Sequence, residues 1–165
     1  MKTQVEFRSS KFPPYEGEEE QINPGLWGKR LAEYLVQKLA EKSIATEEMV
    51  AEDWGWYVPV RNEGFRLALC CGHQSGDDDE FVCFTDPSTP IVKKFLKKID
   101  ATAQLTRLTE ALQQILAFDP EIRDVVWTES RGHHLAMRCS ERRQAVAVAG
   151  DGEPCLLSKR ETVKC

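Results

Sequence analysis

The amino-acid sequence predicts an α+β fold, a two-layer sandwich with an antiparallel or mixed sheet of about four to five strands and helices packed on one face. The main observation is an order of periodic segments: one strand, a long helix, three strands, two helices and a last strand. The chain has 165 residues, of which 41% are hydrophobic and 30% are charged, so it is long enough for one globular domain with a real core.

The first predicted strand covers residues 3–8 and turns Val5 and Phe7 inward. A connection rich in proline and glycine follows, and it contains the acidic run Glu18-Glu19-Glu20. We interpret this run as solvated, with a contact to a basic partner as the alternative.

Asn23-Pro24 is typical of a helix start, with Asn23 as the N-cap, and predicts a helix over about residues 24–42. Gly25 and Gly28 are poor helix formers, so they are positions where another backbone could approach. An anion bound at the helix N-terminus near Lys29 is a further alternative. The apolar stripe of this helix is Trp27, Leu31, Tyr34, Leu35 and Leu39.

The stretch 52–60 is the centre of the chain in this interpretation, because it holds two of the four tryptophans after two carboxylates. Alternation places Trp54 and Trp56 on one strand face together with Val58 and Val60. Filling of the core by both indoles is the simpler reading, and the alternative is a pocket or partner surface. The candidate ligand- or partner-binding residues are Glu52, Asp53, Trp54, Trp56 and His73.

Two details of this stretch carry expectations. Pro59 cannot donate a ladder hydrogen bond, so it belongs to an edge strand or to a strand end. Gly55 leaves room for a backbone, a ring or a ligand. Because buried indoles need a partner for their N–H, we expect Glu52 or Asp53 to accept an indole or backbone N–H, or else to face a ligand.

The next segments predict more strands. Residues 61–64 are a hairpin loop, residues 65–71 are a strand, and residues 80–85 are a strand inside the sheet because both its faces are apolar. The run Asp77-Asp78-Asp79-Glu80 lacks the alternating spacing of a calcium loop, so we interpret it as solvated.

The last part of the domain is expected to be mainly helical. Residues 90–99 predict a short helix with four lysines on its exposed face, residues 101–118 a second helix, and residues 121–128 a final strand. We expect residues 1–128 to form the compact α+β domain and residues 129–165 to form a weakly ordered or atypical C-terminal tail.

The composition excludes several functions. A formal net charge of -5 argues against general binding of a phosphate backbone. No apolar run approaches the roughly 18 residues of a membrane span, and the first residues lack a signal-peptide pattern, so a cytoplasmic location is expected. The six cysteines lack C-x-x-C spacing, and the first three, Cys70, Cys71 and Cys83, are interpreted as small buried hydrophobes in strands. No metal and no cofactor are expected. Metal sites at Cys70, Cys71 and His73, or at His133-His134, are the minor alternatives.

Several short motifs are similar to those of a group of small bacterial proteins to which no activity is attached. They are Phe12-Pro13, Glu18-Glu19, Asn23-Pro24-Gly25, the stretch from Trp27 to Glu33 and the stretch from Glu52 to Trp56. The resemblance covers roughly residues 7–128, and residues beyond about Glu129 differ from the usual ending. It implies a compact single domain in a bacterial cytoplasm and carries over no catalytic residue.

No catalytic motif such as G-x-S-x-G, a P-loop or H-E-x-x-H occurs in the sequence. We therefore expect a non-catalytic protein-interaction module, of an immunity or regulatory type, whose partner has a basic surface. The alternative is a small enzyme that uses Glu52 or Asp53 with His73 as acid and base groups.

Overall fold

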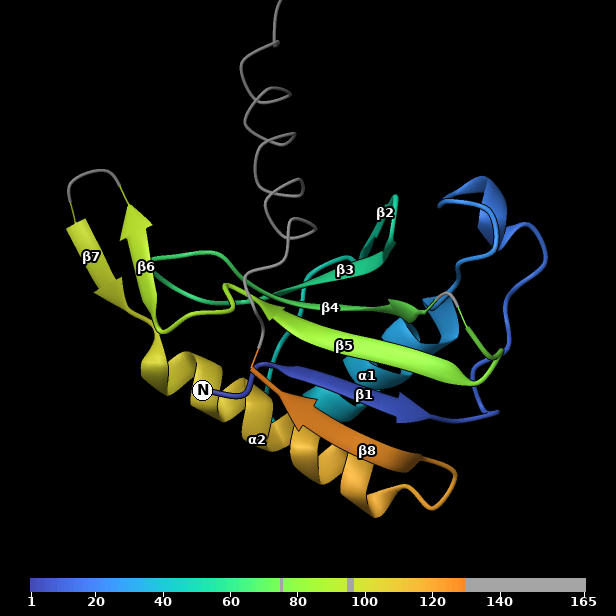
Figure 1. The fold of residues 1–165 in the computed structure, drawn as a ribbon. Helices are drawn as coiled ribbons and strands as arrows, with labels where there is room; N and C mark the ends of the chain where they lie inside the picture. Colours follow the sequence, from blue (N-terminus) through green and yellow to red (C-terminus); the bar gives the residue numbers. More distant parts are fainter. Residues whose placement is uncertain (75, 95–96, 130–165) are drawn as a thin grey trace, which may run out of the picture.

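The structure is a computed structural model that describes residues 1–74, 76–94 and 97–129. Six antiparallel strands form one sheet in the order β2-β3-β4-β5-β1-β8, and two helices lie together on one of its faces (Figure 1). The prediction of an α+β fold with helices on one face is confirmed, although the sheet has more strands than expected. The expected tail lies outside the described residues, apart from Glu129.

The sheet strands are β1 (Gln4–Arg8), β2 (Val50–Glu52), β3 (Gly55–Val60), β4 (Leu67–His73), β5 (Glu80–Asp86) and β8 (Arg123–Thr128). The helices are α1 (Lys29–Glu41) and α2 (Thr102–Phe118), with a 3-10 turn, η1, at Glu18–Glu20. A separate hairpin consists of β6 (Ile91–Lys94) and β7 (Lys97–Asp100).

The core lies between the helices and the sheet face that carries Val5, Val58, Leu69 and Cys83. Alternate residues of each strand point to this face, as the period of two predicted. Leu31, Leu35 and Leu39 of the predicted apolar stripe are buried in this core, together with Leu67 and Leu69 of β4 and Leu108 and Leu112 of α2. Trp27 is only half-buried and packs against the edge of the core.

The helix expected over residues 24–42 begins later, at Lys29. Asn23 is not its N-cap, because Asn23 to Leu26 form a turn in which the Leu26 N–H donates to the Asn23 carbonyl at 3.1 Å. Gly25 has a φ of 79°, which no right-handed helix contains. Gly25 and Gly28 therefore interrupt the predicted helix near its start, and α1 begins only after them.

The prediction of a short helix over residues 90–99 is wrong, because this segment contains the two strands of the β6–β7 hairpin. Val92 pairs with Ile99 across the hairpin, and both pack against the core. The Ala101 N–H donates to the Pro90 carbonyl at 2.8 Å and closes the base of the hairpin. Apolar residues spaced for a helix face thus serve instead as a cross-strand pair, which single-sequence periodicity does not distinguish in so short a segment.

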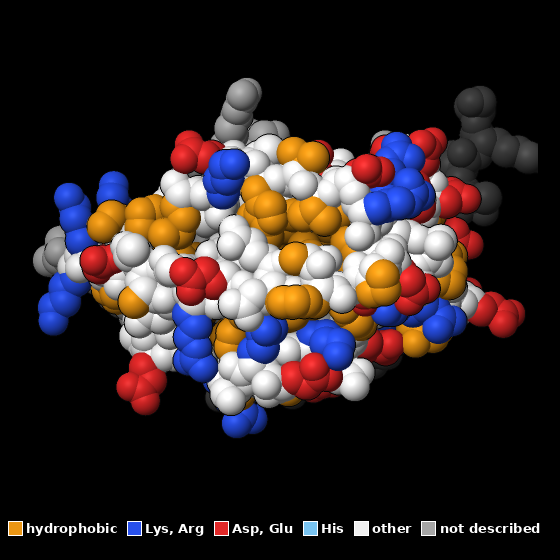
Figure 2. All heavy atoms as spheres, turned by 90° about the horizontal axis from the view of Figure 1, so that it is seen from below, with side chains coloured by type: hydrophobic (Ala, Val, Ile, Leu, Met, Phe, Trp, Pro, Cys, Tyr) orange, Lys and Arg blue, Asp and Glu red, His pale blue; other side chains and the backbone are white. Residues whose placement is uncertain are grey.

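The hairpin stands out from the body of the molecule (Figure 1). Figure 2 shows basic side chains gathered at the edge where this hairpin lies, while charges of both signs are mixed over the rest of that view. The lysines described as exposed there are Lys93, Lys97 and Lys98. In the described part of the chain, no helix is long and apolar enough to cross a membrane.

The remaining elements match their predictions within a few residues. β5 pairs with β4 on one side and with β1 on the other, so its interior position is confirmed. Pro59 lies next to the end of β3, where its carbonyl accepts the Glu47 N–H at 2.9 Å. The turn between β3 and β4 contains Gly64 with a φ of 91°, as expected of a hairpin loop.

Candidate functional site

The aromatic stretch forms the β2–β3 hairpin, and its two tryptophans lie on opposite faces of the sheet. Trp56 is 4% exposed and belongs to the core under the helices. Trp54 lies in the turn before β3 and packs with Tyr57 and Phe84 on the face opposite α1 and α2. The expectation that both indoles share one face is wrong, because the hairpin turn precedes Gly55 and breaks the alternation at Trp54.

The indole of Trp56 finds its partner far away in the sequence. Its Nε1–H donates to Oε1 of Glu18 at 2.9 Å. The same oxygen accepts the backbone N–H groups of Gly28 and Lys29, each at 2.7 Å. The Tyr15 N–H donates to the other oxygen, Oε2, at 3.0 Å. Glu18 is 1% exposed, so the four donors replace the water that this carboxylate has lost.

This carboxylate corrects two interpretations of the sequence. Glu18 is not solvated like its neighbours Glu19 and Glu20, and it, rather than Glu52 or Asp53, accepts the indole N–H of Trp56. The anion weighed for the N-terminus of α1 is the chain's own side chain. Nothing local marks Glu18 among three consecutive glutamates, because three of its four donors, on Gly28, Lys29 and Trp56, are ten or more residues away in the chain.

Three glycines meet beside this carboxylate, and we call Gly28, Gly55 and Gly72 the glycine junction. A Cβ on Gly28 would lie 2.8 Å from the Gly72 Cα, and one on Gly55 would lie 2.6 Å from the Cys71 carbonyl oxygen. The room that the sequence indicated at Gly28 and Gly55 is therefore filled by the backbone of β4. At Gly25, by contrast, a Cβ would meet nothing within 4 Å.

His73 follows the glycine junction and is 5% exposed. Its ring stacks on Trp27 with a centroid distance of 3.5 Å and an interplanar angle of 12°, and it meets Phe81 edge-on at 5.9 Å. Nε2 lies 3.1 Å from the Asp77 carbonyl, while Nδ1 is buried without a hydrogen-bond partner among the described residues. The imidazole is enclosed by aromatic rings, so a substrate has little access to it.

The other groups of the enzyme hypothesis lie elsewhere. The Asp53 carbonyl accepts the Asn23 N–H at 3.1 Å, which ties the β2–β3 turn to the segment before α1. Cys70, Cys71 and Cys83 are buried free thiols, and burial together with a hydrogen bond to Cys71 raises the pKa of Cys83 well above its usual value. The described residues contain no group of three side chains suited to hold a metal ion.

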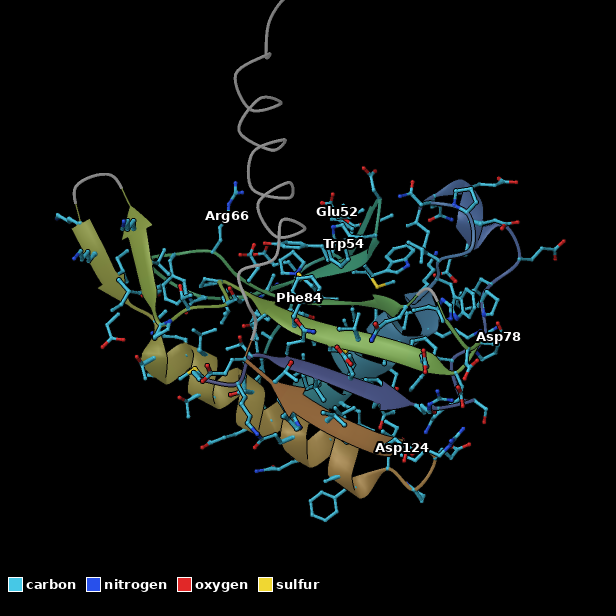
Figure 3. The ribbon with its side chains drawn as sticks, in the orientation of Figure 1. Glu52, Trp54, Arg66, Asp78, Phe84 and Asp124 are labelled. Carbon is cyan, nitrogen blue, oxygen red and sulfur yellow. The ribbon has the colours of Figure 1, made fainter. Side chains whose placement is uncertain are left out.

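The sheet face opposite α1 and α2 carries a mixed apolar and charged surface. Its central row runs from Tyr57 through Cys70 to Phe84, and the Trp54 ring lies 5.3 Å from the Phe84 ring. Figure 3 shows Glu52, Trp54 and Arg66 on this side of the sheet, with the helices on the other side. We call Glu52, Asp53, Trp54, Tyr57 and Phe84 the open-face patch.

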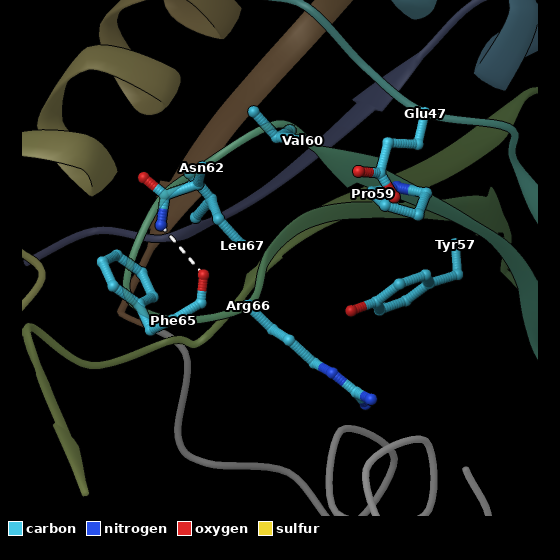
Figure 4. A pocket seen from close by; sticks show the side chains of 8 residues that line it. All are labelled: Glu47, Tyr57, Pro59, Val60, Asn62, Phe65, Arg66 and Leu67. Carbon is cyan, nitrogen blue, oxygen red and sulfur yellow. Dashed lines mark hydrogen bonds between the residues drawn. The ribbon is translucent and has the colours of Figure 1, made fainter. Parts of the chain in front are cut away.

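Asp86 borders this patch at the end of β5. Burial raises its pKa, while the charge of Arg66 and a hydrogen bond from Tyr57 act in the opposite direction. Tyr57 and Arg66 also line a cavity of about 270 Å³, and in Figure 4 both side chains extend to the same side of the β3–β4 hairpin. The other residues that line the cavity are Glu47, Pro59, Val60, Asn62, Phe65 and Leu67.

The structure thus divides the five candidate binding residues predicted from the sequence into two groups. It places Glu52, Asp53 and Trp54 at the open-face patch, and it puts Trp56 and His73 into the packed interior. Tyr57 on β3 and Phe84 on β5 complete this patch, and it is bordered by Asp86 at the end of β5 and by Arg66 in the loop before β4. The alternation of residues along β3, β4 and β5 could have placed Tyr57 and Phe84 on the face opposite the core. The position of Asp86 beside them depends on the register of the strands, which the sequence does not reveal.

Comparison with protein-family models, with curated proteins and with solved structures finds no match to this chain.

Proposed function

We propose that this chain is a non-catalytic protein-interaction module, of an immunity or regulatory type, that binds its partner through the open-face patch. The observation that carries the proposal is the contrast between the two sheet faces. One face is covered by α1 and α2, and the other carries an aromatic cluster in which Trp54 and Phe84 are half-buried and Tyr57 is 7% exposed, with Glu52 and Asp53 beside it. Aromatic side chains that are half-buried at a surface are typical anchors of protein interfaces.

The charges at the patch support a partner with a basic surface. Asp53 is exposed, and Glu52 and Trp54 are half-buried beside it in the β2–β3 hairpin. An arginine of a partner could stack on the Trp54 indole and meet a carboxylate at the same time, which combines cation–π attraction with a charge-assisted hydrogen bond. The formal net charge of -5 favours the approach of a basic protein at low salt.

The environment of His73 supports binding rather than catalysis. A general base needs access to a substrate, and this imidazole is enclosed by Trp27 and Phe81. The buried carboxylate of Glu18 is held by four N–H donors and stabilises the fold. Neither group is among the residues that line the cavities of about 180, 270 and 350 Å³ in the described part of residues 1–129.

A capture experiment tests the proposal. The immobilised protein is exposed to bacterial extract, and retained proteins are compared for wild type, Trp54→Ala and Phe118→Ala. Phe118 is the matched control, because it is 85% exposed at the end of α2, far in the sequence from the patch. We expect one protein whose retention falls at least about tenfold with Trp54→Ala, is unchanged with Phe118→Ala and falls as salt rises.

Retention that Trp54→Ala leaves unchanged would contradict the assignment of the patch. Binding that is insensitive to salt would contradict a basic partner but leave the aromatic contact standing.

A further inference from the structure

A second cavity, separate from the open-face patch, lies where the start of α2 meets the chain after α1 and the β3–β4 loop. Its volume is about 180 Å³, far above the roughly 10–15 Å³ that a single water needs and below the range of roughly 300–1,000 Å³ for drug-sized ligands. Its apolar lining comes from four buried side chains. These are Ile44, Val60, Leu67 and Leu108.

The charges at this cavity are one-sided. Arg61 and Arg107 line it, and no carboxylate does. Within residues 1–74, 76–94 and 97–129, neither arginine forms an ion pair; Arg107 donates from Nη2 to the Ser43 carbonyl at 2.7 Å. Both arginines are exposed, so solvent screens their mutual repulsion, and an anion between them would gain a charge-assisted contact from each guanidinium.

Two other cavities among the described residues lack this imbalance. The lining of the cavity of about 270 Å³ contains one carboxylate, Glu47, and one arginine, Arg66. A third cavity, of about 350 Å³ between α1 and the end of α2, has an equal number of lysines and carboxylates. Its charged residues are Lys11, Lys38, Lys42, Glu41, Asp119 and Glu121. Of these three cavities, the smallest is the one with an unopposed positive charge.

Gln104 supplies an independent sign of a ligand. This residue lines the small cavity, and its Oε1 is buried without a hydrogen-bond partner among the described residues. A buried amide oxygen without a donor is unfavourable, so such an atom in a native structure usually has a water or a ligand group as its donor.

We propose that this cavity is a binding site for a small organic carboxylate that also carries an N–H or O–H donor. The carboxylate lies between Arg61 and Arg107, the donor reaches Oε1 of Gln104, and the apolar part rests on Ile44 and Leu108. Acylated or free amino acids and small hydroxy acids have this chemistry. The site is on the helix-bearing side of the sheet, so the proposal does not depend on the partner of the open-face patch.

The test is an NMR titration of the ¹⁵N-labelled protein with three matched probes. N-acetyl-L-alanine has the carboxylate and the donor, isobutyrate has the carboxylate alone, and N-acetyl-L-alaninamide has no charge. We expect saturable shifts of the Gln104 and Asn62 side-chain amides with N-acetyl-L-alanine, at a Kd on the order of 1 mM or below. The neutral amide should bind at least about tenfold more weakly, with isobutyrate between the two.

Variants assign the roles of the residues. Arg61→Gln and Arg107→Gln should each weaken N-acetyl-L-alanine at least about tenfold, since each removes one charge-assisted contact. Gln104→Leu should remove the preference for N-acetyl-L-alanine over isobutyrate. The matched control is Arg66→Gln, an exposed arginine of the neighbouring cavity, which should leave the Kd unchanged. If Arg107→Gln does not fold, Arg61→Gln decides, because the hydrogen bond of Arg61 to the Ala45 carbonyl comes from its backbone N–H, which the substitution keeps.

Three results would overturn the proposal: no saturation with N-acetyl-L-alanine and isobutyrate up to about 20 mM, more than tenfold above the expected Kd, equal binding of the neutral amide, or an equal loss with Arg66→Gln. The last two would reduce any observed shifts to a nonspecific surface effect.

Discussion

A single carboxylate, that of Glu18, joins three parts of the chain that are distant in sequence. It accepts hydrogen bonds from the segment before η1, from the first turn of α1 and from the indole on β3. The N-terminus of a helix favours a negative charge, and buried charge-assisted hydrogen bonds are among the stronger polar contacts in a protein. At the scale of one residue, this side chain fixes where α1 and β3 meet.

Glu18→Gln should lower the free energy of unfolding by about 2–4 kcal/mol, because it removes the charge and sets an amide N–H₂ against an N–H donor. Chemical denaturation measures the loss. Glu19→Gln is the matched control, since Glu19 is exposed in the same turn, and it should change stability by less than about 0.5 kcal/mol. Equal effects of the two substitutions would mean that Glu18 is not the buried cap described above.

At the scale of elements, the glycine junction lets three backbone segments approach one another. Gly72 of β4 lies against both Trp-Gly pairs, and a Cβ on Gly72 would meet the carbonyl oxygens of Trp54 at 3.0 Å and Trp27 at 3.5 Å. The His73 N–H donates to the same Trp27 carbonyl at 2.6 Å. Close backbone contact thus docks the entry of α1 on the end of β4.

Gly28→Ala should destabilise the protein by about 1–3 kcal/mol, because its Cβ would require the backbone of β4 to move. Gly25→Ala is the control for backbone conformation alone: its φ is 79° but its Cβ would meet nothing within 4 Å, so a cost of roughly 1 kcal/mol is expected. Thermal unfolding of the two variants provides the comparison. A smaller loss for Gly28→Ala than for Gly25→Ala would contradict the tight junction.

Asp119 connects the end of α2 to two other segments. It accepts hydrogen bonds from Lys11 and Tyr34, each at 2.7 Å, and its side chain is 8% exposed. Burial alone would raise its pKa, but the bonds from Lys11 and Tyr34 lower the pKa below its ordinary value. The same pair has the reverse effect on Tyr34, whose pKa is raised by burial and by the hydrogen bond to Asp119.

Asp119→Asn should therefore lower stability at neutral pH and matter less in acid. A carboxyl whose folded pKa is depressed stabilises the fold above its unfolded pKa of about 3.9, and this contribution is lost as the pH falls through the folded value. Urea denaturation of wild type and variant from neutral pH to about pH 3 checks the trend. A difference between the two proteins that grows in acid would contradict the assignment.

The helices and strands were predictable where local signals agreed. The β3–β4 hairpin had alternation, Gly64 and apolar pairing together, and α2 had a long apolar stripe with Asp100 accepting the Thr102 N–H at 2.9 Å. The prediction for the β6–β7 segment was wrong, because the apolar residues of so short a segment fit both a helical period of 3.6 and a strand period of two. The predicted start of α1 was wrong because Asn23-Pro24 favours a helix start there, whereas Gly25 and Gly28 disfavour a helix. The close contact of Gly28 with the backbone of β4 determines that the helix begins after Gly28.

At the scale of the whole molecule, the sheet depends on the pairing of strands that are far apart in the sequence. β1 lies between β5 and β8, so the first and last strands of the domain pair with each other, and the amino terminus forms an ion pair with Glu129 at 3.1 Å. This order could not be deduced from the sequence, because strand pairing between distant segments leaves no local pattern. The sealed and open faces of the sheet, and hence the candidate sites, depend on it.

Truncation after Glu129 should leave a cooperatively folding domain, because every strand of the large sheet lies before that point. Truncation after Ile122 is the contrasting variant, since it removes β8 and leaves β1 as an edge strand. Circular dichroism during urea denaturation distinguishes the two. Loss of the cooperative transition in the longer fragment would show that residues beyond Glu129 are needed for folding.

The most direct test of the central claim is photo-cross-linking at the open-face patch in bacterial cells. The analogue p-benzoylphenylalanine replaces Phe84 in one variant and Phe118, exposed on α2, in the other. We expect a discrete adduct with a protein of basic surface from position 84, which Trp54→Ala abolishes, and no such adduct from position 118. The same adducts from both positions, or an adduct at position 84 that persists with Trp54→Ala, would contradict binding through this face.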